Sequence, residues 1–358
     1  MKARRTVAAL ALAVIATAPL AAPPATAAAT PTIAQLIGQK LIVRMDGTTP
    51  SASLLGRIRR GEIGGVILFG ANVVDATQIK ALTTLLHDTA IGAGQPRLLI
   101  AVDQEGGAIK RIPWAPPTLS PPQMGKLGST TTARSQGAAT GKALKDLGID
   151  IDLAPVADVP ASTLSFLYRQ GRTWSFDSSK TAWLSWAFAQ GLQLGGVLPV
   201  MKHFPGLGYA TKNTDTTVVG IHESAAALNP GLQPYRVGIR YGLPIVMLSN
   251  ATYPAWDPIH PAGWSSAVGT TLLRTQMGFR GVTMTDSLDG TAAARGMTTA
   301  HLAFRACQAG TDMLLLTGSE SSSAGVYASL VKSSTAGQIS LTRLRASWTR
   351  IQALKAGA

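Results

Sequence analysis

Cysteine, histidine and aromatic residues are scarce in this chain of 358 residues. The single cysteine, Cys307, excludes an internal disulfide, so the stability of the fold must come from its hydrophobic core. Cys307 lies in an amphipathic helical pattern at residues 300–310, where a small buried residue is the usual role, and we do not expect a nucleophile there. The five histidines show no spacing typical of a metal site, so we expect no metal.

Acidic residues are also few, with 18 Asp and Glu against 32 Lys and Arg, which gives a net charge of +14. This excess indicates either attraction to anionic polymers, such as those of a cell wall, or an aid to solubility alone. The basic residues are scattered and form no recognised binding motif, so we do not expect nucleic acid as a partner. Beyond the N-terminus, no apolar run approaches the length of a membrane span.

Residues 1–29 have the pattern of a secretory signal peptide. A basic start is followed by an apolar run at residues 7 to about 20 and by small-residue cleavage sites ending at 27 and 29. The Arg4–Arg5 pair leaves twin-arginine export open beside the general secretory route, and no cysteine follows at a lipid-attachment position. We expect a secreted or cell-wall associated protein whose residues 30–358 form one domain, because no linker interrupts them.

Short apolar runs recur along this domain, with helical patterns between them. They occupy residues 40–45, 64–69, 97–103, 150–159, 197–204, 243–250, 281–287 and 311–317. Continuous apolar runs are typical of parallel strands that are buried on both faces. Eight such strands alternating with helices predict an α/β fold, a single (β/α)8 barrel of the TIM type. A doubly wound open sheet is the alternative.

Polar side chains stand at nearly every strand end read from the sequence. They are Asp46, Asn72, Asp103, Gln104, Glu105, Asp158, Lys202, His203, Asn250, Asp286 and Asp312. In a (β/α)8 barrel the active site lies at the carboxyl ends of the strands. A pocket rich in Asp and Lys with few aromatic residues suits a polyhydroxylated ligand.

Asp286, just past the apolar strand 282–284, is the candidate nucleophile. A carboxylate at the mouth of a barrel can attack an anomeric carbon or stabilise its positive charge. Asp286 and Ser287 also precede a helical pattern, so a helix N-cap is the alternative role.

The segment LLRTQMGFRGVTMTDSLD, residues 272–289, resembles the active-site signature of family 3 glycoside hydrolases. Further segments resemble that family in order and spacing: GQKLIVRMDGTTPS, GEIGGVILFGANV, AVDQEGGAIKR, DLAPVADV, GRTWSFD and MKHFPGLG. The resemblance runs from about residue 37 to 318. It is to the single-domain bacterial branch, the NagZ-type β-N-acetylglucosaminidases.

This resemblance implies a role for five residues. Asp286 would be the nucleophile that forms a covalent glycosyl–enzyme intermediate. Asp103 would bind hydroxyls of the terminal sugar, Arg172 would help to bind that sugar, and Lys202 and His203 would donate hydrogen bonds to its hydroxyls. Charge-assisted hydrogen bonds of this kind suit vicinal hydroxyls.

Structural roles remain open for several of these polar residues. Glu105 and Asp158 are either ligands or buried partners of Arg or Lys. Lys202 could form a structural ion pair, and His203 could be a strand-end histidine with its hydrogen bonds satisfied. A Schiff-base role for Lys202 fits its position at a strand end but not the neighbouring motifs.

The loop after the fifth strand departs from the resembled branch, which supplies a catalytic histidine there, oriented by an aspartate. The first loop histidine is replaced by Leu207. Asn213, Thr214 and Asp215 stand where Asp, Ser and the catalytic His are expected.

Three interpretations follow from this departure. In the first, Asp215 is the acid/base, with a pKa raised by burial and by the charge of the nucleophile. In the second, the acid comes from elsewhere, for example from His222 or Glu223 just downstream. In the third, the barrel has lost turnover and only binds glycans.

Two further positions differ from the resembled branch. Asn250, a candidate for substrate binding, stands where a histidine is frequent, and Ala108 stands where an arginine is usual. These differences leave a β-glucosidase as an alternative activity.

The sequence therefore predicts a secreted, exo-acting, retaining β-N-acetylhexosaminidase that needs no cofactor. Its substrate would be terminal β-linked N-acetylglucosamine on cell-wall or chitin-type oligosaccharides. Asp286 would be the nucleophile and Asp215 the acid/base. A glycan-binding barrel without catalytic activity is the alternative from another class of protein.

Overall fold

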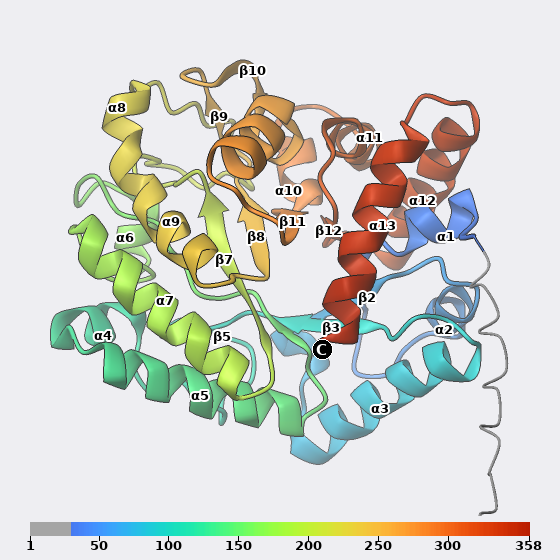
Figure 1. Ribbon diagram of the computed structural model, residues 1–358. Coiled ribbons are helices and arrows are strands. Elements are labelled where there is room, and N and C mark those ends of the chain that lie inside the picture. Colours follow the sequence, from blue (N-terminus) through green and yellow to red (C-terminus); the bar gives the residue numbers. More distant parts are fainter. Residues whose placement is uncertain (1–29) are drawn as a thin grey trace, which may run out of the picture. The chain divides into compact units, whose positions relative to one another are not determined.

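The computed structural model describes residues 30–358, and the predicted signal peptide lies outside them. Eight parallel strands form the centre of the unit Thr32–Ala358 (Figure 1). They are β1 (Leu41–Arg44), β2 (Gly65–Leu68), β3 (Leu99–Val102), β6 (Ile151–Asp152), β7 (Leu198–Phe204), β8 (Ile245–Leu248), β11 (Val282–Thr285) and β12 (Leu314–Leu316). Each strand lies within an apolar run that the sequence singled out.

The sheet closes on itself. Its strands are neighbours in chain order, from β1 to β12, and a parallel bridge between Met284 and Met313 joins β11 to the segment that leads into β12. The predicted (β/α)8 barrel is confirmed, and the alternative of a doubly wound open sheet is wrong.

The apolar strands are explained by burial on both faces. Every residue of β8 is buried, for example, although its side chains alternate between the barrel interior and the helices. Ile42, Leu99, Val200 and Met284 belong to the cluster inside the barrel. A polar residue in mid-strand would lose water on either face, which is why these strands lack the alternation of a half-exposed sheet.

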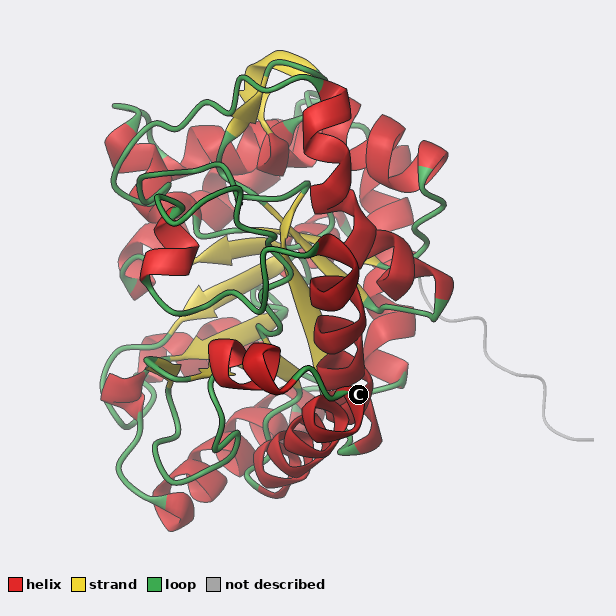
Figure 2. Ribbon diagram, turned by 90° about the vertical axis from the view of Figure 1, so that its left-hand side faces the viewer, coloured by secondary structure: helices red, strands yellow, loops and turns green. Residues whose placement is uncertain are grey.

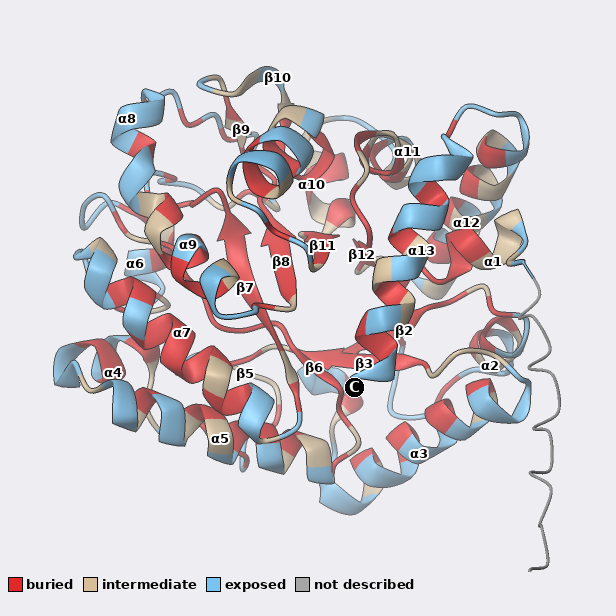
Figure 3. Ribbon diagram, in the orientation of Figure 1, coloured by how far each residue is buried: buried red, intermediate tan, exposed pale blue. Residues whose placement is uncertain are grey.

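Helices surround the barrel and turn their buried faces inward (Figures 2 and 3). They are α1 (Ile33–Gly38), α2 (Ala52–Arg59), α3 (Ala76–Gly92), α4 (Pro121–Leu127), α5 (Thr130–Asp146), α6 (Phe166–Arg169), α7 (Ser178–Leu194), α8 (Ala225–Leu228), α9 (Gln233–Arg240), α10 (Leu288–Ala294), α11 (Thr299–Ala309), α12 (Glu320–Thr335) and α13 (Leu341–Ala356). Side chains of Ser, Thr or Asp cap many of their N-termini, as Asp75 does for α3. Cys307 is buried on α11, as expected.

Short elements complete the fold. The hairpin of β4 (Gln104–Gly106) and β5 (Ile109–Lys110) follows β3, and that of β9 (Thr252–Tyr253) and β10 (Asp257–Pro261) follows β8. Single turns occupy Gly70–Asn72, Asn229–Leu232 and Ala262–Trp264, and a wider helix occupies Ala267–Gln276. No helix of residues 30–358 is long and apolar enough to cross a membrane.

One expected strand end is wrong. Asp312 precedes β12 instead of following it, so it lies at the opposite end of the barrel from the other strand-end residues. There it is fully buried between Arg274 and Arg350, with 2.7 Å between its Oδ1 and a terminal guanidinium nitrogen of Arg350. Its role is to link the wider helix 267–276 and α13 to the barrel.

Candidate active site

A cavity of about 300 Å³ opens where the carboxyl ends of the strands converge. The predicted residues Asp103, Arg172, Lys202, His203, Asp215 and Asp286 all line it. Asn250 does not. Its side-chain amide donates a hydrogen bond to the Ser287 carbonyl oxygen at 2.7 Å, behind the cavity wall.

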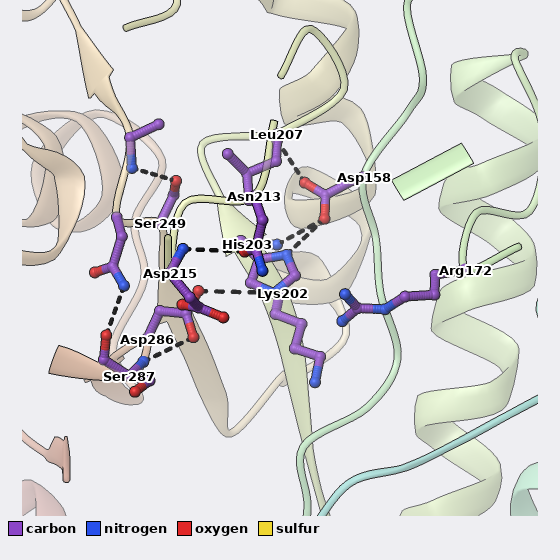
Figure 4. Close-up of polar contacts among 12 residues, drawn as sticks. Asp158, Arg172, Lys202, His203, Leu207, Asn213, Asp215, Ser249, Asp286 and Ser287 are labelled. Atoms are coloured by element: carbon purple, nitrogen blue, oxygen red, sulfur yellow. Dashed lines mark hydrogen bonds and ion pairs between the residues drawn. The ribbon is translucent and has the colours of Figure 1, made fainter. Parts of the chain in front are cut away.

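Asp286 is fixed directly at the end of β11. Its backbone N–H donates to the Leu248 carbonyl of the neighbouring strand at 3.0 Å, and its Oδ1 accepts a hydrogen bond from the Ser287 N–H at 2.7 Å. Ser287, and not Asp286, is the residue that precedes the first turn of α10. The carboxylate is therefore not the cap of that helix, and its Oδ2 faces Nε2 of His203 at 3.9 Å (Figure 4).

Four charged side chains form a continuous ion-pair network on the opposite wall. Lys202 Nζ lies 2.7 Å from both Asp103 Oδ1 and Glu105 Oε1. Arg172 holds Glu105 with two hydrogen bonds, Nε to Oε2 at 2.8 Å and a terminal nitrogen to Oε1 at 2.7 Å. Lys202 is thus an ion-pair partner and a wall of the cavity at once, and Glu105 is a buried partner of both cations.

The network keeps Glu105 and Lys202 charged despite their burial. Burial alone would raise the pKa of Glu105, but Lys202 and Arg172 outweigh it and lower that pKa to about 2. Burial likewise disfavours the charge of Lys202, yet Asp103 and Glu105 raise its pKa. These side chains therefore present fixed charges, which is the arrangement that binds sugar hydroxyls with charge-assisted hydrogen bonds.

His203 is oriented by Asp158. Asp158 Oδ2 lies 2.8 Å from His203 Nδ1 and also accepts the His203 N–H at 3.1 Å, while its Oδ1 accepts the Leu207 N–H at 2.6 Å. Asp158 is fully buried, as one interpretation of the sequence proposed, but its partner is a histidine instead of an Arg or Lys. This contact turns Nε2 of His203 toward the cavity.

Asp215 reaches the cavity from the loop after β7. Its backbone N–H donates to Asn213 Oδ1 at 3.0 Å, so Asn213 holds the turn that presents it. The same backbone packs on Gly290 in the first turns of α10, where an added Cβ would lie only 2.7 Å from the Asp215 carbonyl oxygen. Because α10 begins just after Asp286, this close approach brings Asp215 beside Asp286 (Figure 4).

The surroundings of Asp215 favour its protonated form. Burial raises its pKa, and the charge of Asp286 raises it further. His203, Arg172 and Lys202 act in the opposite direction, and the pKa is about 7. Its Oδ1 is buried and has no hydrogen-bond partner within residues 30–358. Near neutral pH this carboxyl can therefore both give and accept a proton.

The two alternative acids are not in the cavity. Neither His222 nor Glu223 belongs to its lining, whereas Leu207, which replaces the first loop histidine, is buried in its wall.

Some residues of the site were missed in the sequence. Asp152 of β6 is buried next to the network, where its Oδ1 accepts the Gln104 N–H at 2.9 Å, and burial raises its pKa to about 8. Arg111 lines the cavity over the Phe69 ring, 3.8 Å from Asp103 Oδ2. Its position soon after Asp103 was a usable signal. Lys212, which is exposed on the loop before Asp215, also lines the cavity, and no pattern in the sequence pointed to it.

The site consists of two adjacent carboxyl groups, Asp286 and Asp215, facing a wall of charged side chains at the top of a (β/α)8 barrel, and the pKa of Asp215 is raised to about 7. This combination defines the class of barrel hydrolases that act on glycosidic bonds. Residues 32–354 match the family model described as "Glycosyl hydrolase family 3 N terminal domain". The chain belongs to glycosyl hydrolase family 3 and is an O-glycosyl hydrolase.

Relatives and solved structures agree with this assignment. An uncharacterized secreted glycosyl hydrolase of Arthroderma benhamiae is 33% identical over 324 residues, covering 89% of this chain and 92% of that one. A β-hexosaminidase of Nitrosomonas eutropha is 34% identical over 286 residues, covering 77% and 80%. The structure of a β-N-acetylhexosaminidase from Beutenbergia cavernae superposes with a TM-score of 0.83 at 31% identity, covering 91% and 99%.

Proposed function

We propose that this chain is an exo-acting, retaining β-N-acetylhexosaminidase that removes terminal β-linked N-acetylglucosamine from cell-wall or chitin-type oligosaccharides. The names of the relatives from Nitrosomonas eutropha and Beutenbergia cavernae support the sugar. A cavity of about 300 Å³ that ends at the barrel core suits one terminal sugar and so supports exo action.

The proposed reaction has two steps. Asp286 Oδ attacks the anomeric carbon while Asp215 transfers its proton to the glycosidic oxygen, so the C–O bond breaks and the leaving sugar departs with that proton. Asp215, now a carboxylate, then takes a proton from water, and the resulting hydroxide displaces Asp286 from the anomeric carbon. Two inversions give a product with retained configuration and return both carboxyl groups to their starting states.

One observation carries this proposal: Asp215 lies in the cavity beside Asp286 with its pKa raised to about 7. A carboxyl group whose pKa is raised by its surroundings can serve as the general acid beside a second carboxylate that acts as the nucleophile. A general acid works best with a pKa near the working pH. The loop aspartate thus has the property that a catalytic histidine would otherwise supply.

The nucleophile is tested with an activated aryl N-acetyl-β-glucosaminide and a fluorinated glycoside that traps the intermediate. We expect release of the aryl alcohol and a covalent mass adduct on the peptide that contains Asp286. If neither appears while the protein still binds the sugar, the chain is a glycan-binding barrel. Faster release from an aryl glucoside than from the N-acetylglucosaminide would identify a β-glucosidase instead.

The acid is tested with Asp215→Ala, using the exposed loop residue Thr216→Ala as a matched control. For oligosaccharides, whose leaving groups need protonation, we expect kcat/KM to fall by about 10²- to 10⁴-fold. For activated aryl substrates the fall should be much smaller, because their leaving groups need little protonation. Equal losses on both substrates, or no loss on either, would show that Asp215 is not the acid.

We also propose that the protein is exported after cleavage of residues 1–29 and meets its substrate at the cell wall. The secreted description of the Arthroderma benhamiae relative and the excess of basic residues support this location. N-terminal sequencing of the protein from culture medium and from isolated walls tests it. A protein found only inside the cells, with residues 1–29 intact, would contradict it.

A further inference from the structure

A second hollow lies beside the cavity, on the other side of a thin wall. Its volume is about 180 Å³, and its lining includes Val159, Pro160, Phe176, Pro205, Tyr209 and Leu228. The segment 205–209 separates the two hollows, with Leu207 lining the cavity and its neighbours Gly206 and Gly208 lining the second hollow. Below, this second hollow is called the outer hollow.

Exposed aromatic rings gather at the outer hollow. Phe176 and Tyr209 are 48% and 38% exposed and both line it, and Tyr168 packs on Phe176 with 4.9 Å between ring centroids. Six large aromatic side chains are exposed in residues 30–358, and three of them meet at this one place. Exposed apolar surface that gathers in one place, and is not scattered singly, indicates a binding site.

Hydrogen bonds between neighbouring loops hold the wall of the outer hollow in place. The Ala161 N–H donates to the Gly208 carbonyl at 3.1 Å, and the Phe166 N–H donates to the Ala210 carbonyl at 2.7 Å. At Gly208 an added Cβ would lie 1.7 Å from the Val159 carbonyl oxygen, so only glycine lets the two loops touch. A site held in this way loses little conformational entropy on binding.

The lining favours one kind of occupant. It contains no charged side chain, so it does not select an ion. A volume of about 180 Å³ corresponds to roughly six water molecules, which is about the size of one pyranose ring. Such a ring has an apolar C–H face for the aromatic side chains and a polar rim for the Tyr209 hydroxyl, whose present contact with the Ala227 carbonyl is long, at 3.4 Å.

Helix α6 lies between the mouth of the cavity and the aromatic group at the outer hollow. Helix α6 contributes Phe166 and Leu167 to the cavity and Tyr168 to the aromatic group, and Gln170, just after it, is exposed at the cavity mouth. A chain whose terminal sugar occupies the cavity, and which leaves the cavity past Gln170, would pass residues that adjoin Tyr168 and Phe176.

We propose that the outer hollow, with Phe176 and Tyr209 at its centre, is a subsite that stacks a sugar ring of the leaving oligosaccharide. This inference rests on the proposed function and adds that the protein prefers longer chains to disaccharides. It also assigns that preference to residues that take no part in the chemistry.

The test compares kcat/KM for an aryl N-acetyl-β-glucosaminide with kcat/KM for β-1,4-linked N-acetylglucosamine oligomers of two to five units. In the wild-type protein kcat/KM should rise with chain length. Each of the variants Phe176→Ala and Tyr209→Ala should lower kcat/KM for the longer oligomers by about fivefold. Neither should change kcat/KM for the aryl substrate. Phe176→Tyr and Tyr209→Phe keep the rings and should retain the gain.

Trp183→Ala is the matched control, because Trp183 is 47% exposed on α7 but lines neither hollow. Aryl turnover without a chain-length gain, or an equal loss in the control, overturns the subsite and leaves the proposed function standing. If no substrate is turned over, the result contradicts the proposed function and not the subsite. Calorimetric titration with the pentamer then still decides the subsite, since Phe176→Ala should weaken binding about fivefold and unchanged binding contradicts it.

Discussion

The two walls of the cavity differ in whether their charged groups have partners. On one wall Asp103, Glu105, Arg172 and Lys202 satisfy one another with short ion pairs. On the other wall the Oδ1 atom of Asp215 has no hydrogen-bond partner within residues 30–358. In the proposed function, the first wall binds the sugar because its charges are stabilised there, and the second transfers protons because a charge on Asp215 is disfavoured there. The difference predicts that the first wall stabilises the fold and the second costs stability.

The largest expected effect is a loss of kcat when the proposed nucleophile, Asp286, is replaced. Asp286→Asn keeps the shape of the side chain but removes the nucleophile, so kcat should fall by about 10⁴-fold or more on every substrate, activated or not. Steady-state and single-turnover rates measure this loss. Asp46→Asn, at an exposed strand end outside the cavity, serves as the control and should keep full activity.

A different pattern would contradict the role of Asp286. If Asp286→Asn lost activity only on poor leaving groups, Asp286 would be acting in proton transfer, and the roles of the two carboxyl groups would be exchanged. The mass adduct with the fluorinated trap separates these cases, because it must disappear in Asp286→Asn.

The stability of the binding wall is tested with Glu105→Gln. This change leaves Arg172 buried without its partner and removes one of the two partners of Lys202, and loss of one member of a buried ion pair costs about 3–5 kcal/mol. Urea denaturation at neutral pH measures the change. Asp146→Asn breaks an exposed pair with Lys142 and should cost no more than about 0.5 kcal/mol.

The pH dependence of this effect has a defined sign. The pKa of Glu105 is lowered to about 2 in the folded protein, so its stabilisation is complete above the unfolded pKa near 4.5. It is lost as the pH falls from there toward 2. The difference in unfolding free energy between wild type and Glu105→Gln should shrink over this range, and a difference that stays constant would mean that packing, and not charge, is responsible.

The cavity residues that stand at strand ends could be predicted from the sequence, because the carboxyl ends of parallel strands meet at one end of the barrel. An apolar run places the next polar residue at a known end of the barrel, and this was enough to bring Asp103, Lys202, His203 and Asp286 to one cavity. The same argument failed for Asp312, because the run 311–317 does not show that its first residues lie before the strand.

The proton-transfer wall could be predicted only in part. The spacing singled out Asp215, but its place depends on the contact of its backbone with Gly290, 75 positions away and invisible in any local pattern. Asn250 shows the same difficulty, since its strand end was identified correctly but its amide turns to Ser287. The direction of a loop side chain is set by contacts with residues that are distant in the sequence. Local sequence patterns do not reveal such contacts.

Gly290→Ala tests whether this distant contact positions the acid. A methyl group there would meet the Asp215 carbonyl oxygen at 2.7 Å and its Cβ at 3.1 Å, so the loop must shift. Displacement of an acid by a fraction of an ångström to about 1 Å should lower kcat on oligosaccharides by roughly 10- to 100-fold. Aryl substrates should be affected much less, and Gly325→Ala on α12, where a Cβ meets open space, is the control. Equal losses on both kinds of substrate would mean that the change disturbs Asp286 instead.

The smallest effect is the most direct test of the difference between the walls. The pKa of Asp215 is raised from 3.8 to about 7 on folding, so this carboxyl group destabilises the folded protein progressively as the pH rises from about 4 to about 7, and the loss is complete above pH 7. Asp215→Asn removes that charge and keeps the shape. We expect the variant to be more stable than wild type by about 1–3 kcal/mol near pH 8.

This gain must vanish at low pH. Near pH 4 the folded wild type already holds Asp215 protonated, so the two proteins should unfold at the same urea concentration, and the difference should open as the pH rises toward 7. A variant less stable than wild type at pH 8 would show that Lys202, Arg172 and His203 stabilise the Asp215 carboxylate. Asp215 would then be a poor acid at neutral pH, because the charges that bind the sugar would also hold the carboxylate ionised.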